Sequence, residues 1–558
     1  MKFDRRTLLK GIGAAGATLA LSGHASAANG NAQYVVVANG NGVARRLGSG
    51  FEVAQELAGG DVLVVHGPAD AAGELQGVGG VQAATGDLRF ALETPAETAT
   101  PEADVGKGVE GDWYENLWDK QNSETVAAND VATGEGAKIG IIDTGIDYAH
   151  PDLTPNLNGD AGRLFREGEI RSGVEDVVVN NPNAPADPNT DPNPEVSEDV
   201  QVLSQELAAD VNGHGTHVAG IAAADPTAGV GGPFGDGVQG VAPDAELRSY
   251  RAFWWVYSQE AGEWTPTTTT GDILGAIDYG AAQGLDVVNL SLGTPPFLPR
   301  ENQNEDVRTL RLAYERVVRS AVNRGTVVVA SAGNDDADLQ RKGRFSLPNS
   351  TNGALSISAL GPNDEKSVFS NFGTSEIDLG AGGGTYETDQ KTYIGVLEWL
   401  QAGRPLRRSN HPLDEGDEAT LLLDEDGNVV FNPNEAAEVR TVESPAWPYP
   451  FNLVFSTTSP TNEGSPYGWK AGTSMSAPNV TGLVALVREL DPDASPKHVE
   501  NALKKNADGG RGRSDPALGA GRINALDTVR SVAGSGGGNG GGNNGNGNGN
   551  GRGRGRGR

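Results

Sequence analysis

The chain has 558 residues, and its 74 Asp and Glu residues outnumber its 43 Lys and Arg residues, so the formal net charge is −31 at pH 7. A strongly acidic body repels the phosphate backbone of nucleic acids, and we therefore expect no nucleic-acid partner. The sequence contains no Cys, which excludes disulfides and thiol chemistry.

The first 27 residues have the pattern of a targeting segment. Arg5 and Arg6 precede a modest apolar run at 11–21, and Ala25-Ser-Ala27 offers a cleavage site. The apolar run is too short and too rich in Gly and Ala to span a bilayer, so we expect no stable membrane anchor. Residues 1–27 therefore predict a twin-arginine signal peptide, export of the folded protein and an extracellular location.

Residues 28–108 have the pattern of a small, separate α/β unit. We expect strands at 34–37 and 61–65, a helix at 50–57 and two weaker strands within 78–92. A linker rich in Ala, Glu and Thr follows. The pattern alone leaves open whether this unit is a permanent domain or is removed.

An apolar, β-branched run at 138–142 predicts a buried parallel strand that ends at Asp143. The carboxyl ends of such strands are the usual edge for functional sites in open α/β sheets. The stretch that follows, near 154–209, is rich in Asp, Glu, Asn and Pro. We expect an insertion there that forms a mobile acidic loop, because it has little apolar surface to bury.

A helix of small residues is predicted to begin at His214, in the sequence Asn-Gly-His-Gly-Thr-His-Val-Ala-Gly. His214 and His217 have the spacing of a two-ligand metal pair. No Glu lies between them and the chain has no Cys to complete a zinc site, so we favour a packing role for His217.

Two further segments follow in the second half of the chain. A run at 326–330 predicts another buried strand, which leads into Ser-Ala-Gly and then Asn334. A second insertion lies near 385–450. Within it, 421–431 predicts a β-hairpin whose turn is Asp426-Gly427.

The segment 472–478, Gly-Thr-Ser-Met-Ser-Ala-Pro, precedes an apolar run that predicts a buried helix. Pro478 is tolerated there because early helix N–H groups have no intrahelical partner. A serine in this place is commonly just an N-cap. Together with Asp143, His214 and Asn334, however, Ser474 completes the residue types needed for acyl transfer: orienter, base, oxyanion donor and nucleophile.

These four motifs, in this order, resemble the subtilisin-like serine proteases, the subtilases. The resemblance implies that Ser474 attacks the peptide carbonyl, His214 moves the proton, Asp143 orients His214 and Asn334 stabilises the oxyanion. It also implies that substrate lies along two short segments, comprising Ser291, Leu292, Gly293, Ser331, Ala332 and Gly333.

The resemblance extends to fold and cofactors. It implies a subtilisin-like α/β domain over 109–534, with a parallel sheet flanked by helices, and a ferredoxin-like α+β propeptide at 28–108 that inhibits the enzyme. No cofactor is expected for catalysis. Asp152 matches a calcium ligand of the family, but the loop that should complete the site is not recognisable, so a turn-capping role for Asp152 stays open.

The twin-arginine segment, the acidity and the scarcity of Lys, 12 of the 43 basic residues, resemble the halolysins of halophilic archaea. A protein that is merely acidic and secreted is the alternative. The tail at 535–558 consists of Gly, Asn and Arg and cannot form a core, so we expect it to be disordered.

The expected function is that of a secreted, monomeric serine endopeptidase that acts on proteins or peptides, with broad specificity and a dependence on salt. One alternative is a catalytically inactive protein of the same fold that only binds. Another is an esterase of the α/β-hydrolase class. The esterase is disfavoured because Ser474 is not in a G-x-S-x-G motif and follows the histidine in the chain.

Overall fold

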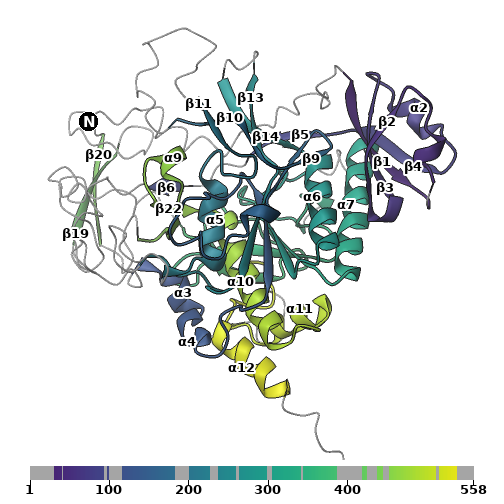
Figure 1. Ribbon diagram of the computed structural model, residues 1–558. Coiled ribbons are helices and arrows are strands. Elements are labelled where there is room, and N and C mark those ends of the chain that lie inside the picture. Colours follow the sequence, from purple (N-terminus) through teal and green to yellow (C-terminus); the bar gives the residue numbers. More distant parts are fainter. Residues whose placement is uncertain are drawn as a thin grey trace, which may run out of the picture.

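The computed structural model covers most of the chain (Figure 1). The residues it describes are 31–40, 42–92, 97–99, 116–181, 200–226, 237–258, 263–297, 304–340, 343–385, 418–423, 437–443, 451–509 and 515–536. The predicted signal peptide, the Asp426-Gly427 turn and nearly all of the predicted tail lie outside these residues.

An eight-stranded sheet forms the centre of the molecule, with the strand order β18-β17-β16-β15-β7-β12-β8-β9. All neighbouring strands pair in parallel except β8 and β9, which are antiparallel. The strands are β7 (Lys138–Asp143), β8 (Arg163–Arg166), β9 (Glu169–Arg171), β12 (Glu246–Arg251), β15 (Val287–Leu290), β16 (Val327–Ser331), β17 (Ala354–Leu360) and β18 (Leu379–Gly382). The expected parallel α/β sheet is confirmed.

Helices cover both faces of this sheet, because its strands are apolar on both sides. Val287 and Val329 point into a core shared with helices on one face, while Val288 and Val328 point into a second core on the other. The first face carries α3 (Trp118–Asn122), α4 (Thr125–Asn129), α5 (His214–Ala223), α10 (Thr473–Leu490), α11 (Pro496–Lys505) and α12 (Ala525–Gly536); the second carries α6 (Thr270–Ala282) and α7 (Glu305–Asn323).

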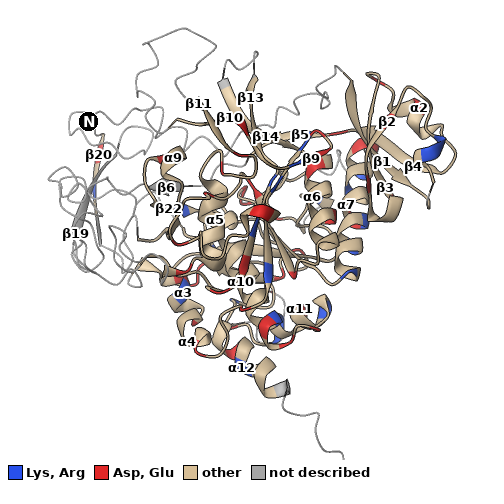
Figure 2. Ribbon diagram, in the orientation of Figure 1, with Lys and Arg blue, Asp and Glu red and all other residues tan. Residues whose placement is uncertain are grey.

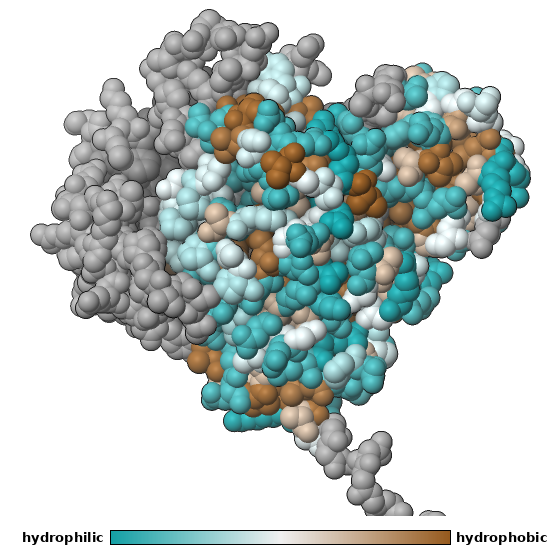
Figure 3. Space-filling model, viewed as in Figure 1, coloured by the Kyte–Doolittle hydropathy of each residue, from teal (hydrophilic) through white to brown (hydrophobic). Residues whose placement is uncertain are grey.

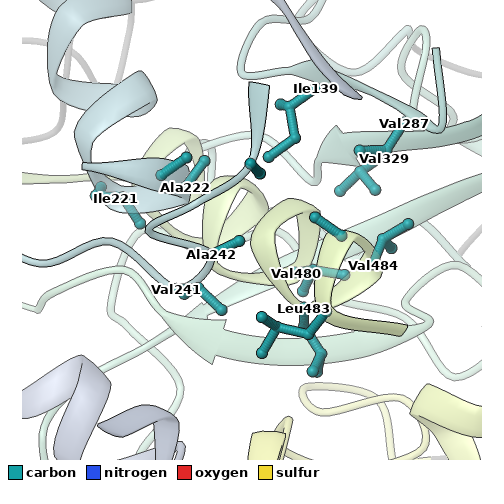
Figure 4. Close-up of a cluster of buried hydrophobic side chains, with 14 of the residues drawn as sticks. Ile139, Ile221, Ala222, Val241, Ala242, Val287, Val329, Val480, Leu483 and Val484 are labelled. Carbon is teal, nitrogen blue, oxygen red and sulfur yellow. The ribbon is translucent and has the colours of Figure 1, made fainter. Parts of the chain in front are cut away.

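Helix α10 is the most deeply placed of these helices. Val480, Leu483 and Val484 interdigitate with side chains of the sheet and of α5 (Figure 4). The helix also contacts β15, β16, β17 and β18. Every residue from Thr473 to Arg488 is buried, so the start of α10 has a fixed position relative to the strand ends.

Residues 32–91 form a separate four-stranded antiparallel sheet with the order β2-β3-β1-β4, seen in purple in Figure 1. The elements are β1 (Ala32–Ala38), β2 (Glu52–Leu57), β3 (Val62–Gly67), α2 (Ala72–Gln76), β4 (Val81–Gly86) and β5 (Arg89–Ala91). Strand β5 leaves this sheet and pairs with the main body. The α+β architecture agrees with the expectation for this unit.

The helix expected at 50–57 is wrong, because these residues form strand β2. Six residues are too few to hold a helix without help from packing. As a strand, the segment pairs along β3 and places Leu57 in a core. The place between β1 and β2, where a first helix was expected, holds only the short 3-10 turn Ala44–Arg46.

The expectation of a mobile loop without a core at 154–209 is also wrong for the described residues. Strand β8 joins the main sheet, and Phe165 is fully buried. Strands β10 (Val174–Asn180) and β11 (Val200–Glu206) form an antiparallel ribbon that buries Val177 and Val179. These strands can form because apolar residues alternate through this acidic stretch and place Val177 and Val179 on one buried face. Its Asn-, Asp- and Pro-rich middle, 182–199, lies outside the described residues.

The remaining strands form short ribbons. In the second insertion, β19 (Glu418–Leu423) pairs antiparallel with β20 (Glu438–Glu443), so the partner of the first strand lies beyond the predicted 428–431. The others are β6 (Glu97–Ala99), β13 (Trp254–Ser258), β14 (Glu263–Thr269), β21 (Val454–Thr457) and β22 (Tyr467–Ala471); a short helix, α9 (Pro460–Glu463), precedes β22. Within the described part of the chain, no helix has the length and apolar character needed to cross a bilayer.

Candidate active site

Asp143 and His214 meet at the centre of the main sheet. Asp143 is the last residue of β7 and His214 is the first residue of α5. His214 Nδ1 lies 2.7 Å from Asp143 Oδ1, and both side chains are fully buried. The close approach depends on Gly215, because a Cβ atom there would lie 2.1 Å from the carbonyl oxygen of Gly145.

Asp210, which sequence reasoning missed, ties these two elements together. Its carboxylate accepts hydrogen bonds from the hydroxyl of Thr144 (2.8 Å), from the N–H of Gly213 (2.9 Å) and from the N–H of Thr216 (2.9 Å). These groups come from the end of β7 and the start of α5. A buried carboxylate with this many donors is well satisfied, and it fixes the position of His214 relative to Asp143. Its only sequence signal was an acidic residue four positions before His214.

Ser474 is the second residue of α10 and is almost completely buried. Its Oγ donates to the carbonyl of Ser291 at 3.3 Å. His214 Nε2 is buried and makes no hydrogen bond within the described residues. In unliganded enzymes the serine–histidine hydrogen bond is often long and forms only with substrate, so this arrangement is compatible with a nucleophile at rest.

The prediction that Pro478 lies among the early N–H groups of its helix is wrong. Pro478 is the sixth residue of α10 and lies beyond the first turn, where N–H groups have no helical partner. Its missing N–H would have bonded to the carbonyl of Ser474. The hydroxyl of Ser291 donates to that carbonyl instead, at 2.7 Å.

Asn334 follows the end of β16 and lies beside the start of α10. Its Oδ1 accepts hydrogen bonds from the N–H of Thr473 (2.8 Å) and from the Thr473 hydroxyl (2.9 Å). The same hydroxyl accepts a hydrogen bond from the N–H of Gly333 at 3.1 Å. These contacts fix the amide plane of Asn334 next to the residue that precedes Ser474.

The two predicted substrate segments extend from adjacent parallel strands. Ser291, Leu292 and Gly293 follow β15, and Ser331, Ala332 and Gly333 lie at and after the end of β16. The Ser331 hydroxyl donates to the carbonyl of Leu290 at 3.4 Å. At Gly333 φ is 96°, and a Cβ atom would lie 2.4 Å from Asn371, so this position requires glycine.

His217 is fully buried, and its Nε2 lies 3.2 Å from the carbonyl oxygen of Gly468. Burial lowers the pKa of His217 well below its ordinary value. The neutral, packed side chain agrees with the structural role that we favoured. No cluster of three His, Cys, Asp or Glu side chains suited to a metal occurs among the described residues.

Asp152 is buried, and its Oδ2 accepts hydrogen bonds from the N–H of Val238 (2.8 Å) and from the hydroxyl of Tyr467 (2.8 Å). Burial raises the pKa of the Asp152 carboxyl above its ordinary value. The carboxylate therefore links the segment at Val238 to the first residue of β22.

The end of the small N-terminal unit pairs with the main body at two places. Strand β5 pairs antiparallel with β14, and the N–H of Leu92 donates to the carbonyl of Pro266 at 2.8 Å. Strand β6 pairs antiparallel with β22, with Glu97 opposite Ala471, three residues before Ser474. The chain between these two pairings, residues 93–96, lies outside the described residues.

An α/β fold with a serine, a histidine and an aspartate at the carboxyl edge of its sheet defines a class of hydrolases. Residues 134–521 match the model of the Subtilase family, peptidase S8. The chain therefore belongs to the subtilase family.

Individual relatives support this assignment. The chain is 32% identical over 255 residues to the thermophilic serine proteinase of Bacillus sp. strain AK1, covering 46% of each protein. It is 26% identical over 404 residues to subtilisin Savinase of Lederbergia lenta, covering 72% of this chain and 94% of that protein.

A solved structure resembles the fold as a whole. The epidermin leader peptide processing serine protease of Staphylococcus aureus matches 90% of this chain and 98% of its own, with a TM-score of 0.58 and 19% identity.

Among the curated relatives, the chain spans only 46% of the Bacillus strain AK1 proteinase and 59% of the major intracellular serine protease of Bacillus subtilis strain 168.

Proposed function

We propose that the protein is a secreted serine endopeptidase that hydrolyses peptide bonds through a Ser-His-Asp acyl-enzyme mechanism. The observation that carries the proposal is the buried 2.7 Å contact between Asp143 and His214, beside a serine at the start of a buried helix. An imidazole held at Nδ1 by a carboxylate presents its other nitrogen as a base.

The mechanism uses side chains and backbone N–H groups only. Ser474 Oγ attacks the substrate carbonyl while His214 Nε2 takes its proton and later donates it to the leaving amine. Asp143 stabilises the imidazolium that forms. The N–H of Ser474 and the side-chain amide of Asn334 stabilise the oxyanion, and the acyl-enzyme is then hydrolysed by water. Protein or peptide substrates would lie against the segments after β15 and β16.

We propose that residues 28–108 act as an inhibitory propeptide. The support is the pairing of β5 with β14 and of β6 with β22, since Glu97 of β6 lies opposite Ala471, three residues before Ser474. Strand β6, while it stays paired with β22, would hinder a substrate at this edge. Removal of the unit would then be a step of activation.

The other elements of the proposal rest on the sequence. Export is supported by Arg5 and Arg6, and salt dependence by the net charge of −31. Figure 2 shows Asp and Glu distributed around the described body rather than gathered at one place. The face in Figure 3 carries several apolar patches among hydrophilic residues. The monomeric state stays a prediction. Structural calcium at Asp152 stays a prediction from the family resemblance.

The test is the variant Ser474→Ala, assayed by casein hydrolysis with the purified protein. We expect a folded protein without peptidase activity, because the nucleophile is gone. If processing is autocatalytic, mass spectrometry should also find residues 28–108 still attached. A Ser474→Ala protein that is trimmed normally and digests casein would overturn the proposal. An inactive wild type that folds would favour a binding protein instead.

A further inference from the structure

The carbonyl of the catalytic serine lacks the hydrogen bond that its own helix would normally provide. Pro478 is four residues after Ser474 and has no N–H to donate. Ser474 is only 1% exposed, so water does not replace this donor. A buried acceptor without a partner costs about 1–3 kcal/mol. The hydroxyl of Ser291 removes this cost by donating to the Ser474 carbonyl.

The Ser291 hydroxyl is itself held by a chain of buried polar groups. Asn289 Nδ2 donates to Ser291 Oγ at 2.9 Å. The hydroxyl of Thr481 donates to Asn289 Oδ1 at 2.9 Å. Asn289 and Thr481 are both 0% exposed. This hydrogen-bond chain, Thr481 to Asn289 to Ser291 to the Ser474 carbonyl, thus runs from the middle of α10, through strand β15, and back to the start of α10.

In this hydrogen-bond chain, each hydrogen bond determines which atom donates and which accepts in the next. An amide has an oxygen that only accepts and a nitrogen that only donates. Because Thr481 donates to Asn289 Oδ1, the Asn289 nitrogen must face Ser291. A hydroxyl has a single hydrogen, and when Ser291 Oγ accepts from Asn289 this hydrogen is available for the Ser474 carbonyl.

Asn289 occupies an unusual place for an amide. It lies in β15 between Val288 and Leu290, where the neighbouring side chains are buried and apolar. Burying an amide is costly unless all its groups are hydrogen-bonded. The hydrogen-bond chain gives a partner to both the oxygen and the nitrogen of this amide, and it links the nucleophile to the strand that leads into the predicted substrate segment.

We propose that Asn289 and Thr481 are positioning residues for the nucleophile. They orient the Ser291 hydroxyl so that it replaces the helical hydrogen bond removed by Pro478. This holds the first turn of α10, with the Oγ and N–H of Ser474, in register with the substrate segment after β15. The inference rests on the proposed peptidase function.

The first two variants interrupt the chain without a large change in shape. Asn289→Asp introduces a second acceptor, which draws the Ser291 hydrogen away from the Ser474 carbonyl. Thr481→Val removes the donor that orients Asn289. We expect each variant to lower kcat by about three- to tenfold, the effect of one net hydrogen bond, with KM nearly unchanged. The rate at which a sulfonyl fluoride modifies Ser474 should fall by a similar factor as kcat. The final amount of modified Ser474 gives the concentration of active enzyme from which kcat is calculated.

The decisive comparison repeats both variants in a Pro478→Ala background. Alanine restores the helical N–H to the Ser474 carbonyl, so the chain is no longer needed there. We expect Asn289→Asp and Thr481→Val to lose less than about twofold in kcat relative to Pro478→Ala alone, a coupling that a double-mutant cycle measures. The matched control is Thr528→Val in α12, which removes a buried hydroxyl bonded to the Asn524 carbonyl and should leave kcat unchanged.

Equal losses of kcat in the two backgrounds would overturn the inference, and so would an effect on KM alone. Thermal unfolding of each variant separates a loss of folding from a loss of positioning. If one variant does not fold, the other still decides, because each breaks a different bond of the chain. A folded wild type without peptidase activity would instead reject the proposed function, and the two failures are therefore distinguishable.

Discussion

Asn334 is oriented by hydrogen bonds that occupy one end of its amide. Its oxygen accepts from the N–H and the hydroxyl of Thr473, so the amide plane is held beside the start of α10. The proposed mechanism uses the nitrogen end as a donor to the oxyanion. Asn334→Ala should lower kcat by about 10²–10³, with little change in KM, because the donor acts mainly on the transition state. Steady-state hydrolysis of a peptide substrate measures both constants.

Asn304→Ala is a suitable control for Asn334→Ala. Asn304 caps α7 on the surface, where its side chain accepts a hydrogen bond from the N–H of Asp306. Its loss should lower stability by about 1 kcal/mol and leave kcat unchanged. If Asn334→Ala raised KM alone, Asn334 would be a substrate-binding residue and not an oxyanion donor.

Calcium gives a second test at a single residue. Asp152 accepts hydrogen bonds from Val238 and Tyr467, and no group of three His, Cys, Asp or Glu side chains suited to a metal occurs among the described residues. If Asp152 binds calcium, as the family resemblance implies, a chelator should speed thermal inactivation at fixed salt, and Asp152→Asn should abolish this effect. An unchanged rate would leave Asp152 only the structural role that its hydrogen bonds to Val238 and Tyr467 give it.

Sequence patterns locate functional residues that stand in motifs at the ends of strands and helices. They miss residues whose role depends on a hydrogen bond to another element. Asp143, His214 and Ser474 are recognisable because each stands in a short motif. Asn289 and Thr481 are visible only as polar residues in apolar runs. Their partnership depends on α10 lying against β15, and no local spacing along the chain encodes that contact.

The contact between the small N-terminal unit and helix α6 contains a buried carboxyl pair. Asp87 accepts hydrogen bonds from Gln33 (2.6 Å) and from the N–H of Gly271 (2.9 Å). Burial, together with nearby Asp272, raises the pKa of Asp87 to about 7. Burial raises the pKa of Asp272 to about 6. The buried Tyr314 of α7 also faces this group.

These values predict how docking of the unit responds to pH. A carboxyl group with a higher pKa in the docked state binds more protons there than when exposed. The contribution of Asp87 to docking is therefore complete below its ordinary pKa of 3.8, and it is lost as the pH rises to about 7. Above that pH no further loss is expected.

Asp87→Asn tests this prediction, because asparagine imitates the protonated form. In a Ser474→Ala background, we expect Asp87→Asn to be neutral near pH 4 and to raise the thermal unfolding midpoint above about pH 7. Asp70→Asn, which changes an exposed carboxyl in the same unit, should have no such pH dependence. A difference in midpoint between the Asp87→Asn variant and its parent that stays constant with pH would count against a buried, protonated Asp87.

The errors in predicted elements have a common physical origin. The segment 52–57 could not be recognised as a strand because its neighbour β3 supplies the pairing that stabilises it. Strands β10 and β11 were hidden in acidic sequence because a two-stranded ribbon needs only a few apolar residues on one face. The strand ending at Asp143 was predictable, since a central parallel strand is apolar on both faces.

Charge acts on the molecule as a whole. The folded state concentrates 74 acidic and 43 basic residues that the unfolded chain spreads out. The Debye length is about 10 Å at 0.1 M salt and about 3 Å at 1 M, so molar salt removes most of the repulsion. We expect the half-life of peptidase activity to rise from dilute buffer into molar NaCl or KCl, measured with a reversible inhibitor control to remove autolysis.

Screening should be complete near 1 M salt, because the Debye length is then comparable to ion-pair distances. A further gain above that concentration would indicate cation binding by carboxylates or salting-out of apolar surface. A half-life that is level or falls between about 0.1 and 2 M would reject the halophilic interpretation. The acidity would then serve only solubility, and the peptidase proposal would be unaffected.

The position of α10 also determines when the enzyme can first act. This helix carries Ser474, fills the core beneath β15, β16 and β17, and is made late in synthesis, after every strand of the main sheet. A nascent chain that ends before α10 has neither the nucleophile nor the centre of its core. On the proposed function, a product that ends before residue 473 would therefore be inactive, and peptidase activity would appear only after α10 has been translated and packed.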